Sequence, residues 1–155
     1  MSARPPLELV SSTAFLLKRL GYALKSRAVE AFEAAGESLY HHAVLAVLDE
    51  GARETQATIA DALGYDRSWL VGLLDELEAE GYIERRRDPA DRRRHLVSLE
   101  PAGKKKLAEL RAISQQVEDE FLAPLTAAER EALHGLLLEL AAHHDPRYRP
   151  QATES

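Results

Sequence analysis

The sequence predicts a mainly α-helical fold that carries one β-hairpin. Apolar residues recur at spacings of three and four along most of the 155 residues, a pattern typical of amphipathic helices. Two short β-prone runs, at 82–83 and 96–99, flank a turn signal at 88–91. Short helices that run directly into a hairpin are typical of a winged helix-turn-helix, in which the hairpin is called the wing.

Three short helices are expected before the hairpin. The first covers 38–50, the second begins at its N-cap Thr55 and stops at Gly64, and the third begins at its N-cap Asp66. Only two residues separate the last two helices, a turn of helix-turn-helix length. The three helices and a two-stranded wing make residues 37–100 the predicted winged helix-turn-helix domain. One face of the third helix is expected to be buried through Leu70, Leu73, Leu74 and Leu77.

Long helices with wide apolar faces are predicted at both chain ends, in residues 1–36 and 101–144. Pro124 divides the C-terminal region, and its last helix starts at a capping box at 126–129. These helices carry more apolar surface than the central domain can cover. A homodimer is the simplest arrangement that would bury it. Residues 145–155 are polar and are expected to fray. The residues expected at the dimer interface are Val10, Leu17, Phe121, Leu133, Leu136, Leu137 and Leu140.

The wing concentrates positive charge in an acidic chain. Six arginines lie between Arg85 and Arg94 against two aspartates, which gives this segment a net charge of +4. The formal net charge of the whole chain is -6, so the remainder carries -10. Such segregation is expected when one patch meets a polyanion and the rest keeps the protein in solution. A solvated arginine-rich loop without a partner is the alternative interpretation.

Composition excludes several functional classes. The absence of cysteine rules out a disulfide framework, a thiolate zinc site and a thiol redox switch. The sequence has no long uncharged apolar run and no secretory signal, which predicts a cytoplasmic protein that does not enter a membrane. It also has no glycine-rich phosphate loop, no nucleophile elbow and no acid–base pair in a pocket-forming pattern. Neither catalysis nor a cofactor is therefore expected.

Several motifs resemble the MarR family of bacterial winged-helix regulators over nearly the whole chain. The segment 55–64 is similar to the family's third helix, 66–85 to its recognition helix and first wing strand, and 88–99 to its wing with an Asp-x-Arg element at Asp91 and Arg93. The resemblance implies a homodimer that binds a pseudo-palindromic operator in double-stranded DNA, usually as a repressor. It also implies release by a small aromatic or phenolic ligand.

The face of the recognition helix opposite its leucines is expected to meet DNA. Arg67 can clamp a guanine or a phosphate, Ser68 can donate to either, and Val71 can contact a thymine methyl group. Trp69 can instead pack against the helix at 55–63. The family often has polar or basic residues at three of these positions, which weakens the expectation of base-specific hydrogen bonding but not of DNA binding. The expected contacts are Arg67, Ser68, Trp69, Val71, Gly72 and Asp75.

The wing and the start of the helix at 55 supply further expected contacts. Arg93 is expected in the minor groove, oriented by Asp91 through a charge-assisted hydrogen bond. Arg86 is the weakest wing candidate, because successive strand residues alternate sides. Backbone amides at Thr55 and Gln56 suit a phosphate, although capping alone also explains these residues. The other expected wing contacts are Arg85, Arg87, Arg92 and Arg94, of which the last two are expected to meet phosphates.

The three short helices expected at 38–81 form what we call the reading head. The resemblance places a ligand pocket between this reading head and the dimerisation helices. A phenol or carboxylate there needs a cation or a donor among apolar walls, which Arg19, Tyr40 or His41 can supply. Alternatively, these side chains only pack or face solvent. The expected lining residues are Leu16, Arg19, Leu20, Tyr40, His41 and Leu45.

Two other functions fit parts of the sequence. A metal-responsive regulator would use some of the six histidines, yet four of them form the adjacent pairs His41-His42 and His143-His144, which point to different sides of a helix. The dipole of a helix C-terminus suffices to explain the second pair. No metal site is therefore expected. A winged-helix module that binds protein instead of DNA would use the apolar residues of the recognition helix.

Overall fold

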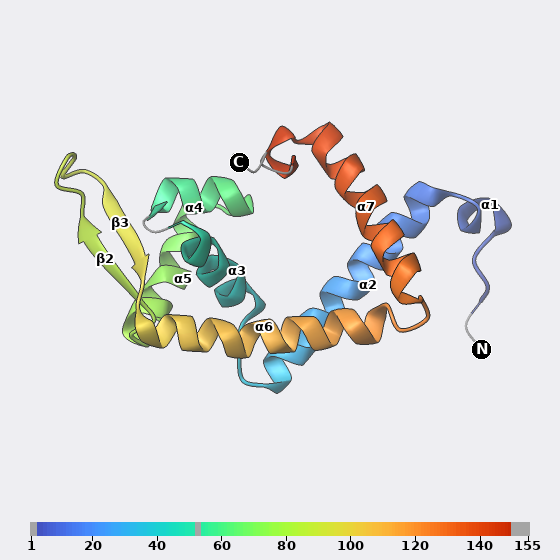
Figure 1. Ribbon diagram of the computed structural model, residues 1–155, viewed down its shortest axis with the longest axis horizontal. Coiled ribbons are helices and arrows are strands. Elements are labelled where there is room, and N and C mark those ends of the chain that lie inside the picture. Colours follow the sequence, from blue (N-terminus) through green and yellow to red (C-terminus); the bar gives the residue numbers. More distant parts are fainter. Residues whose placement is uncertain (1–2, 52–53, 150–155) are drawn as a thin grey trace. The chain divides into compact units, whose positions relative to one another are not determined.

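The structure is a computed structural model, and it describes residues 3–51 and 54–149. Most of it is helical (Figure 1). The chain divides into two compact units, Met1–Val117 and Glu118–Ser155. The first unit contains α1 to α5, a small sheet and most of α6. The second contains the end of α6, then α7 and a short 3-10 helix.

The N-terminal region forms two helices where the sequence predicted one. Helix α1 spans Leu7–Val10 and α2 spans Thr13–Ala34, so Val10 lies outside the long helix. Ser12 separates them as the N-cap of α2, and its hydroxyl accepts a hydrogen bond from the Phe15 amide at 3.2 Å. Serine starts a new helix here because its side chain satisfies an amide that has no partner within the helix.

The three helices of the reading head confirm the predicted pattern of caps. Helices α3, α4 and α5 span Leu39–Glu50, Gln56–Leu63 and Arg67–Ala79. Thr55 caps α4 and Asp66 caps α5, as expected. Gly64 has a φ of 67° and closes α4 in the left-handed conformation that glycine adopts without strain.

The sheet has three antiparallel strands, one more than the predicted two-stranded wing. Strands β2 (Ile83–Arg87) and β3 (His95–Leu99) form the wing, and β1 (Glu54–Thr55) pairs with the other edge of β3. The wing pairing runs from Ile83 opposite Leu99 to Arg87 opposite His95. Two residues are too few to show an alternating pattern, so the sequence gives no signal for β1.

The core lies where the head, the sheet and the start of α6 meet. Leu70, Leu74 and Leu77 of α5 are buried, as the leucine spacing predicted, and Leu73 is 7% exposed. Burying one such side chain contributes about 1.5–3 kcal/mol to folding. The leucines pack in one cluster with residues from each neighbouring element: Phe32, Leu45, Leu48, Ile59, Ile83, Val97, Leu107 and Leu110.

The C-terminal helices begin as the sequence predicted, and a short 3-10 helix follows them. Helix α6 spans Pro101–Phe121, and α7 spans Ala127–His144 with a capping box between Thr126 and Glu129. The residues after 144 were expected to fray. Asp145 caps a 3-10 helix, η1 (Pro146–Tyr148), because its carboxylate accepts the Arg147 amide at 3.0 Å. Residues 150–155 of the predicted tail lie outside the described residues.

Gly103 of α6 packs tightly against Tyr82 and Leu99 at the base of the wing, and a substitution there tests this packing. A Cβ added there would overlap the carbonyl oxygen of Tyr82 and lie 2.7 Å from Leu99 Cδ1. We expect Gly103→Ala to lower the free energy of unfolding by about 1–3 kcal/mol. Gly72→Ala is the matched control, since nothing lies within 4 Å of its added Cβ, and it should raise stability by about 0.5–1 kcal/mol. Urea unfolding followed by circular dichroism measures both; equal stabilities would contradict this packing.

Candidate nucleic-acid interface

The tip of the wing is an ordered turn fixed by its two aspartates. The Asp88 amide donates to the Arg94 carbonyl and the Arg94 amide to the Asp91 carbonyl, both at 2.9 Å. The side chains of Asp88 and Asp91 also accept the amides of Ala90 and Arg93, at 2.9 and 3.0 Å. Aspartates that bind the amide two residues on are typical of such turns. The arginines of the tip therefore project from a defined backbone.

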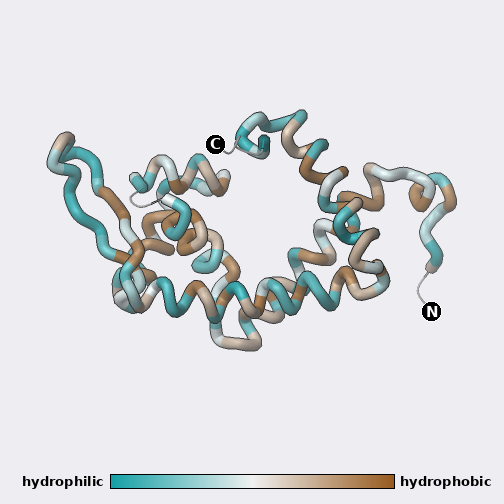
Figure 2. Tube along the Cα trace, viewed as in Figure 1, coloured by the Kyte–Doolittle hydropathy of each residue, from teal (hydrophilic) through white to brown (hydrophobic). Residues whose placement is uncertain are grey.

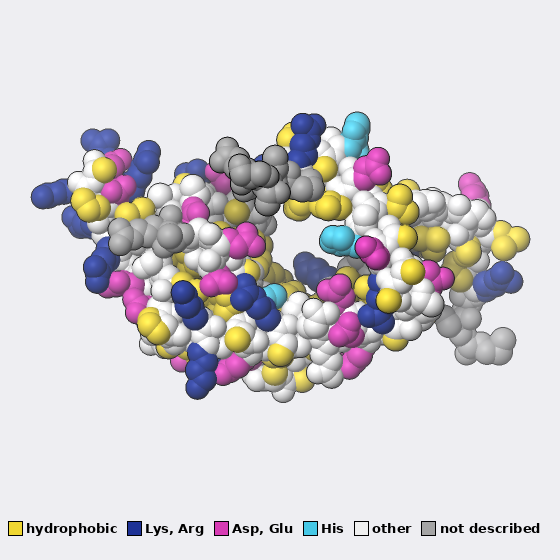
Figure 3. Space-filling view, viewed as in Figure 1, with side chains coloured by type: hydrophobic (Ala, Val, Ile, Leu, Met, Phe, Trp, Pro, Cys, Tyr) yellow, Lys and Arg dark blue, Asp and Glu magenta, His cyan; other side chains and the backbone are white. Residues whose placement is uncertain are grey.

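Four arginine side chains at the tip face solvent. Figure 3 shows Lys and Arg side chains gathered over the wing, at the left of the view, and Figure 2 shows the strongly hydrophilic trace of β2 beneath them. Within residues 3–51 and 54–149, no carboxylate pairs with the guanidinium of Arg87, Arg92 or Arg93. Arg94 is 66% exposed, and its Nε lies 3.4 Å from Asp91 Oδ2. This cluster can meet a polyanion without first breaking strong internal ion pairs.

The predicted orientation of Arg93 by Asp91 is wrong in its detail. Asp91 accepts the backbone amide of Arg93, and its second oxygen faces Arg94 instead of the Arg93 guanidinium. A short aspartate side chain reaches the amide two residues ahead more readily than the end of a long neighbouring side chain. Asp91 therefore shapes the turn from which Arg93 projects.

The six predicted DNA-facing residues of α5 are all exposed, opposite the buried leucines. Arg67 lies at the first helical position. The Ser68 hydroxyl donates to Asp66 Oδ1 at 2.5 Å, so Ser68 takes part in the helix cap. That hydrogen bond, with those from the amides of Trp69 and Ser68, holds the pKa of Asp66 below its usual value.

Trp69 belongs to an aromatic trio and also reaches the surface. Its ring packs edge-to-face on Tyr40 of α3 at 4.8 Å and on Tyr65 of the turn at 4.9 Å, between ring centroids. Burial, followed by the nearby Tyr40, raises the pKa of Tyr65. Trp69 remains 43% exposed and Val71 38% exposed. The trio fixes the start of the recognition helix against α3, whereas the packing partner expected from the sequence was the helix at 55–63.

Arg85 and Asp75 contact each other, although both were predicted to contact DNA. Arg85 Nη2 lies 2.5 Å from Asp75 Oδ1 and from Glu78 Oε2, and Arg85 Nε donates to Glu78 Oε2 at 3.0 Å. The hydrogen bond with Glu78 raises the pKa of Arg85 and lowers that of Glu78. Arg85 and Arg87 share one side of β2 while Arg86 pairs with Glu84 at 2.7 Å. Because they pair with each other, we do not propose Arg85 and Asp75 as DNA contacts.

Thr55 serves mainly to cap the start of α4. The Thr55 hydroxyl accepts the Thr58 amide at 3.1 Å, and the Thr55 amide donates to the Thr58 hydroxyl at 2.9 Å. Thr58 in turn donates to Glu54 at 2.6 Å, which places a carboxylate beside this helix end. Gln56 is half-buried at the first helical position. The amide of Thr55 is thus already satisfied.

The predicted ligand-pocket residues are dispersed in the first unit. Leu45 is fully buried in the core, whereas Leu16 and Leu20 are 42% and 53% exposed on α2. Arg19 is also exposed. Tyr40 belongs to the aromatic trio, and His41 Nε2 lies 2.7 Å from Glu76 Oε2. Sequence spacing does not reveal that His41 would bind a residue 35 positions away.

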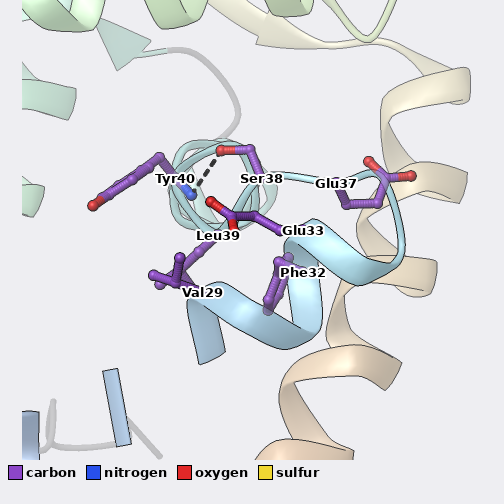
Figure 4. Close-up of a pocket in the computed structure, with 7 residues that line it drawn as sticks. All are labelled: Val29, Phe32, Glu33, Glu37, Ser38, Leu39 and Tyr40. Carbon is purple, nitrogen blue, oxygen red and sulfur yellow. Dashed lines mark hydrogen bonds between the residues drawn. The ribbon is translucent and has the colours of Figure 1, made fainter. Parts of the chain in front are cut away.

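A small hollow lies instead at the turn from α2 to α3, with a volume of about 130 Å³ (Figure 4). Tyr40 is its one lining residue from the predicted set. Glu37 at its rim binds Lys106 Nζ at 2.5 Å. Pockets for drug-sized ligands are about 300–1,000 Å³, so this hollow suits only a small molecule. It is lined by Val29, Phe32, Glu33, Glu37, Ser38, Leu39 and Tyr40.

Three of the six histidines, His42, His143 and His144, have surroundings that give them a structural role. His42 stacks on Phe32 at 5.7 Å between ring centroids, and burial followed by the nearby Arg111 lowers its pKa. His143 and His144 lie in the last turn of α7, where a helix dipole favours positive charge. Across the described ranges, no three His, Cys, Asp or Glu side chains gather as metal ligands do.

The residues predicted for dimerisation are at least partly exposed in the single chain. In the first unit, Val10 and Leu17 are 40% and 43% exposed. In the second, Leu136 and Leu140 are 63% and 50% exposed. Phe121 and Leu133 are half-buried, and Leu137 is exposed. No helix in the described part of the chain has the length and apolar character needed to span a membrane.

The reading head and its arginine-tipped wing define a winged helix-turn-helix protein. A MarR family model matches residues 38–94. A Thauera aromatica protein described as a transcriptional regulatory protein for the hcr operon is 33% identical over 115 residues, covering 74% of this chain and 68% of that protein. Transcriptional regulator HosA of Escherichia coli O111:H- is 30% identical over 99 residues, 64% of this chain and 73% of HosA. The chain belongs to the MarR family.

Solved structures agree with this assignment. The transcriptional repressor CouR bound to a 23-mer DNA duplex is 29% identical, with a TM-score of 0.78 over 90% of this chain and 99% of CouR. CouR from Rhodococcus jostii RHA1 bound to p-coumaroyl-CoA is 25% identical, with a TM-score of 0.74 over 91% of this chain and 97% of that one. The chain is a DNA-binding transcriptional regulator and not an enzyme.

Proposed function

We propose that the protein is a repressor that binds a pseudo-palindromic operator as a homodimer and leaves it when a small aromatic ligand binds. The observation that carries the proposal is the ordered wing tip, whose Arg87, Arg92 and Arg93 have no carboxylate partner among the described residues. In an overall acidic protein, such a cluster favours DNA at one surface. The exposed side of α5 presents Arg67, Trp69 and Val71 for the major groove.

A homodimer is supported by apolar side chains that the single chain leaves uncovered. Leu136 and Leu140 on α7 lie one helical turn apart on one face, and Leu16, Leu17 and Leu20 form a second exposed group on α2. Monomeric proteins rarely expose such groups of large apolar residues. Two copies related by a twofold axis would also match an operator with two half-sites.

Release by an aromatic ligand is supported by CouR, which has been solved both with DNA and with p-coumaroyl-CoA. In this chain, Tyr40 is the one predicted pocket residue that lines the hollow, and it carries a phenol hydroxyl, whereas Arg19 is exposed elsewhere on α2. A phenol hydroxyl among apolar walls suits the polar group of a small aromatic ligand.

Arg93 provides the first test of DNA binding. The probe is a labelled duplex that the wild-type protein enriches from a random pool, and fluorescence anisotropy at several salt concentrations gives affinity and salt slope. We expect Arg93→Ala to weaken binding several-fold and to reduce the salt slope by about one per half-site, because one phosphate or groove contact is lost. Arg86→Ala is the matched control, since Arg86 is paired with Glu84, and should change binding little.

Two outcomes would contradict this proposal. If no duplex is enriched from the pool, the protein does not bind DNA in a sequence-specific way. If Arg93→Ala keeps the wild-type affinity and salt slope, the wing tip is not the DNA-binding surface.

Leu136 provides a test of the homodimer. We expect the wild-type protein to sediment at twice the chain mass of 17.2 kDa. Leu136→Glu should weaken the dimer by about tenfold or more, because it places a charge at an apolar interface. Val71→Glu is the matched control: it changes an exposed aliphatic residue on the DNA-facing side and should leave the dimer intact while weakening DNA binding. A monomeric wild-type protein would refute the homodimer.

Ligand binding can be tested by thermal denaturation with millimolar salicylate and related aromatic acids. A ligand that binds only the folded state raises the unfolding temperature by mass action. We expect such a rise, together with weaker binding of the enriched duplex, and a smaller rise for Tyr40→Phe, which removes only the hydroxyl group of the residue that lines the hollow. Cyclohexanecarboxylate tests the need for an aromatic ring. The absence of any rise with the aromatic acids would remove support for this pocket.

A further inference from the structure

The second half of the recognition helix is unexpectedly acidic for a surface that approaches DNA. Asp75, Glu76 and Glu78 are exposed on α5, and Glu80 is exposed at its C-cap. An unpaired carboxylate near a phosphate is repelled, and at 4 Å the repulsion is about 1 kcal/mol even in water. A helix with this composition therefore needs neutralising partners from its own protein.

Arg85 is such a partner for two of these carboxylates. It projects from the first half of β2 and contacts Asp75 and Glu78, which lie three residues apart on α5. Its side chain is only 18% exposed, whereas the carboxylates are 60% and 40% exposed. The guanidinium thus lies beneath the surface that the carboxylates present, and at least two of its nitrogens are already engaged.

Glu76 has a hydrogen-bond partner from a different element. His41 of α3, with a side chain 19% exposed, has its Nε2 atom 2.7 Å from Glu76 Oε2. Three of the four carboxylates therefore have partners supplied by neighbouring elements. The Arg85 contact additionally joins the base of the wing to α5, so it can set the position of one DNA-binding element relative to the other.

We propose that Arg85 is a positioning residue, which neutralises Asp75 and Glu78 and holds the base of the wing against the recognition helix without touching DNA. The inference rests on the proposed contact of α5 and the wing with DNA. It predicts that DNA affinity depends on Arg85 only while the two carboxylates are charged. A phosphate-contacting arginine would behave differently, since its contribution would not depend on them.

A double-mutant cycle with the enriched duplex as probe distinguishes a positioning role of Arg85 from direct contact with a phosphate. The variants are Arg85→Gln, the pair Asp75→Asn with Glu78→Gln, and all three changes together. We expect Arg85→Gln to weaken binding by about tenfold, the scale of one or two uncompensated charges close to phosphates. In the triple variant, affinity should return to within about threefold of the wild type, with the wild-type salt slope.

Arg86→Gln is the matched control, because it removes one positive charge from the same strand without touching α5. It should alter affinity by less than about twofold, as expected for an exposed surface pair. Arg85→Lys keeps the charge but not the forked geometry, so it should retain more affinity than Arg85→Gln. It also serves as the test variant if Arg85→Gln does not fold by circular dichroism.

The outcomes distinguish this inference from the proposed function. If the carboxylate changes raise affinity by the same factor with and without Arg85, or if Arg85→Gln lowers the salt slope by about one, Arg85 contacts phosphate directly and the inference is wrong. Equal binding by Arg85→Gln and the wild type would also overturn it. If the wild-type protein enriches no duplex at all, the proposed function itself fails.

Discussion

The burial of one leucine face on α5 is the constraint on which the interface depends. Leu70, Leu74 and Leu77 are almost completely enclosed, so the helix cannot rotate without exposing them at a cost of about 1.5–3 kcal/mol each. This burial fixes which side chains point outward. Arg67 and Val71 face solvent because Leu70, Leu74 and Leu77 occupy the opposite, buried face of the helix. The recognition surface is therefore a consequence of core packing, and local sequence specifies both together.

The wing arginines are divided in a similar way between ion pairs within the protein and exposure to solvent. Arg85, near the base of the wing, is used within the protein, whereas the arginines near the tip face outward. The difference follows from distance along the hairpin: the base lies against α5 and its carboxylates, and the tip extends beyond them. A count of six arginines therefore overstates the charge available to a partner. The ordered Asp88–Asp91 turn matters because it presents the outward group from a fixed backbone.

Most of the fold could be predicted because its signals are local. Thr55, Asp66 and Thr126 each cap the helix that was expected to follow, and the leucine spacing on α5 gave the buried face correctly. The differences arose where a local signal was short or ambiguous. Ser12 divides a continuous apolar pattern into α1 and α2, because its capping hydroxyl competes with helix continuation. Strand β1 is only two residues long and is defined by its partner β3.

The candidate site was less predictable because its contacts join residues distant in sequence. Periodicity places Arg85 and Asp75 on exposed sides of their elements, but only the packing of β2 against α5 brings them together. The ligand pocket is harder still, since a cavity is defined by space that several elements leave unfilled. Leu45 shows the difficulty: an apolar residue expected at a pocket wall is a fully buried core residue. Whether a side chain lines a cavity or fills it depends on its neighbours, and pairwise spacing in one helix does not contain that information.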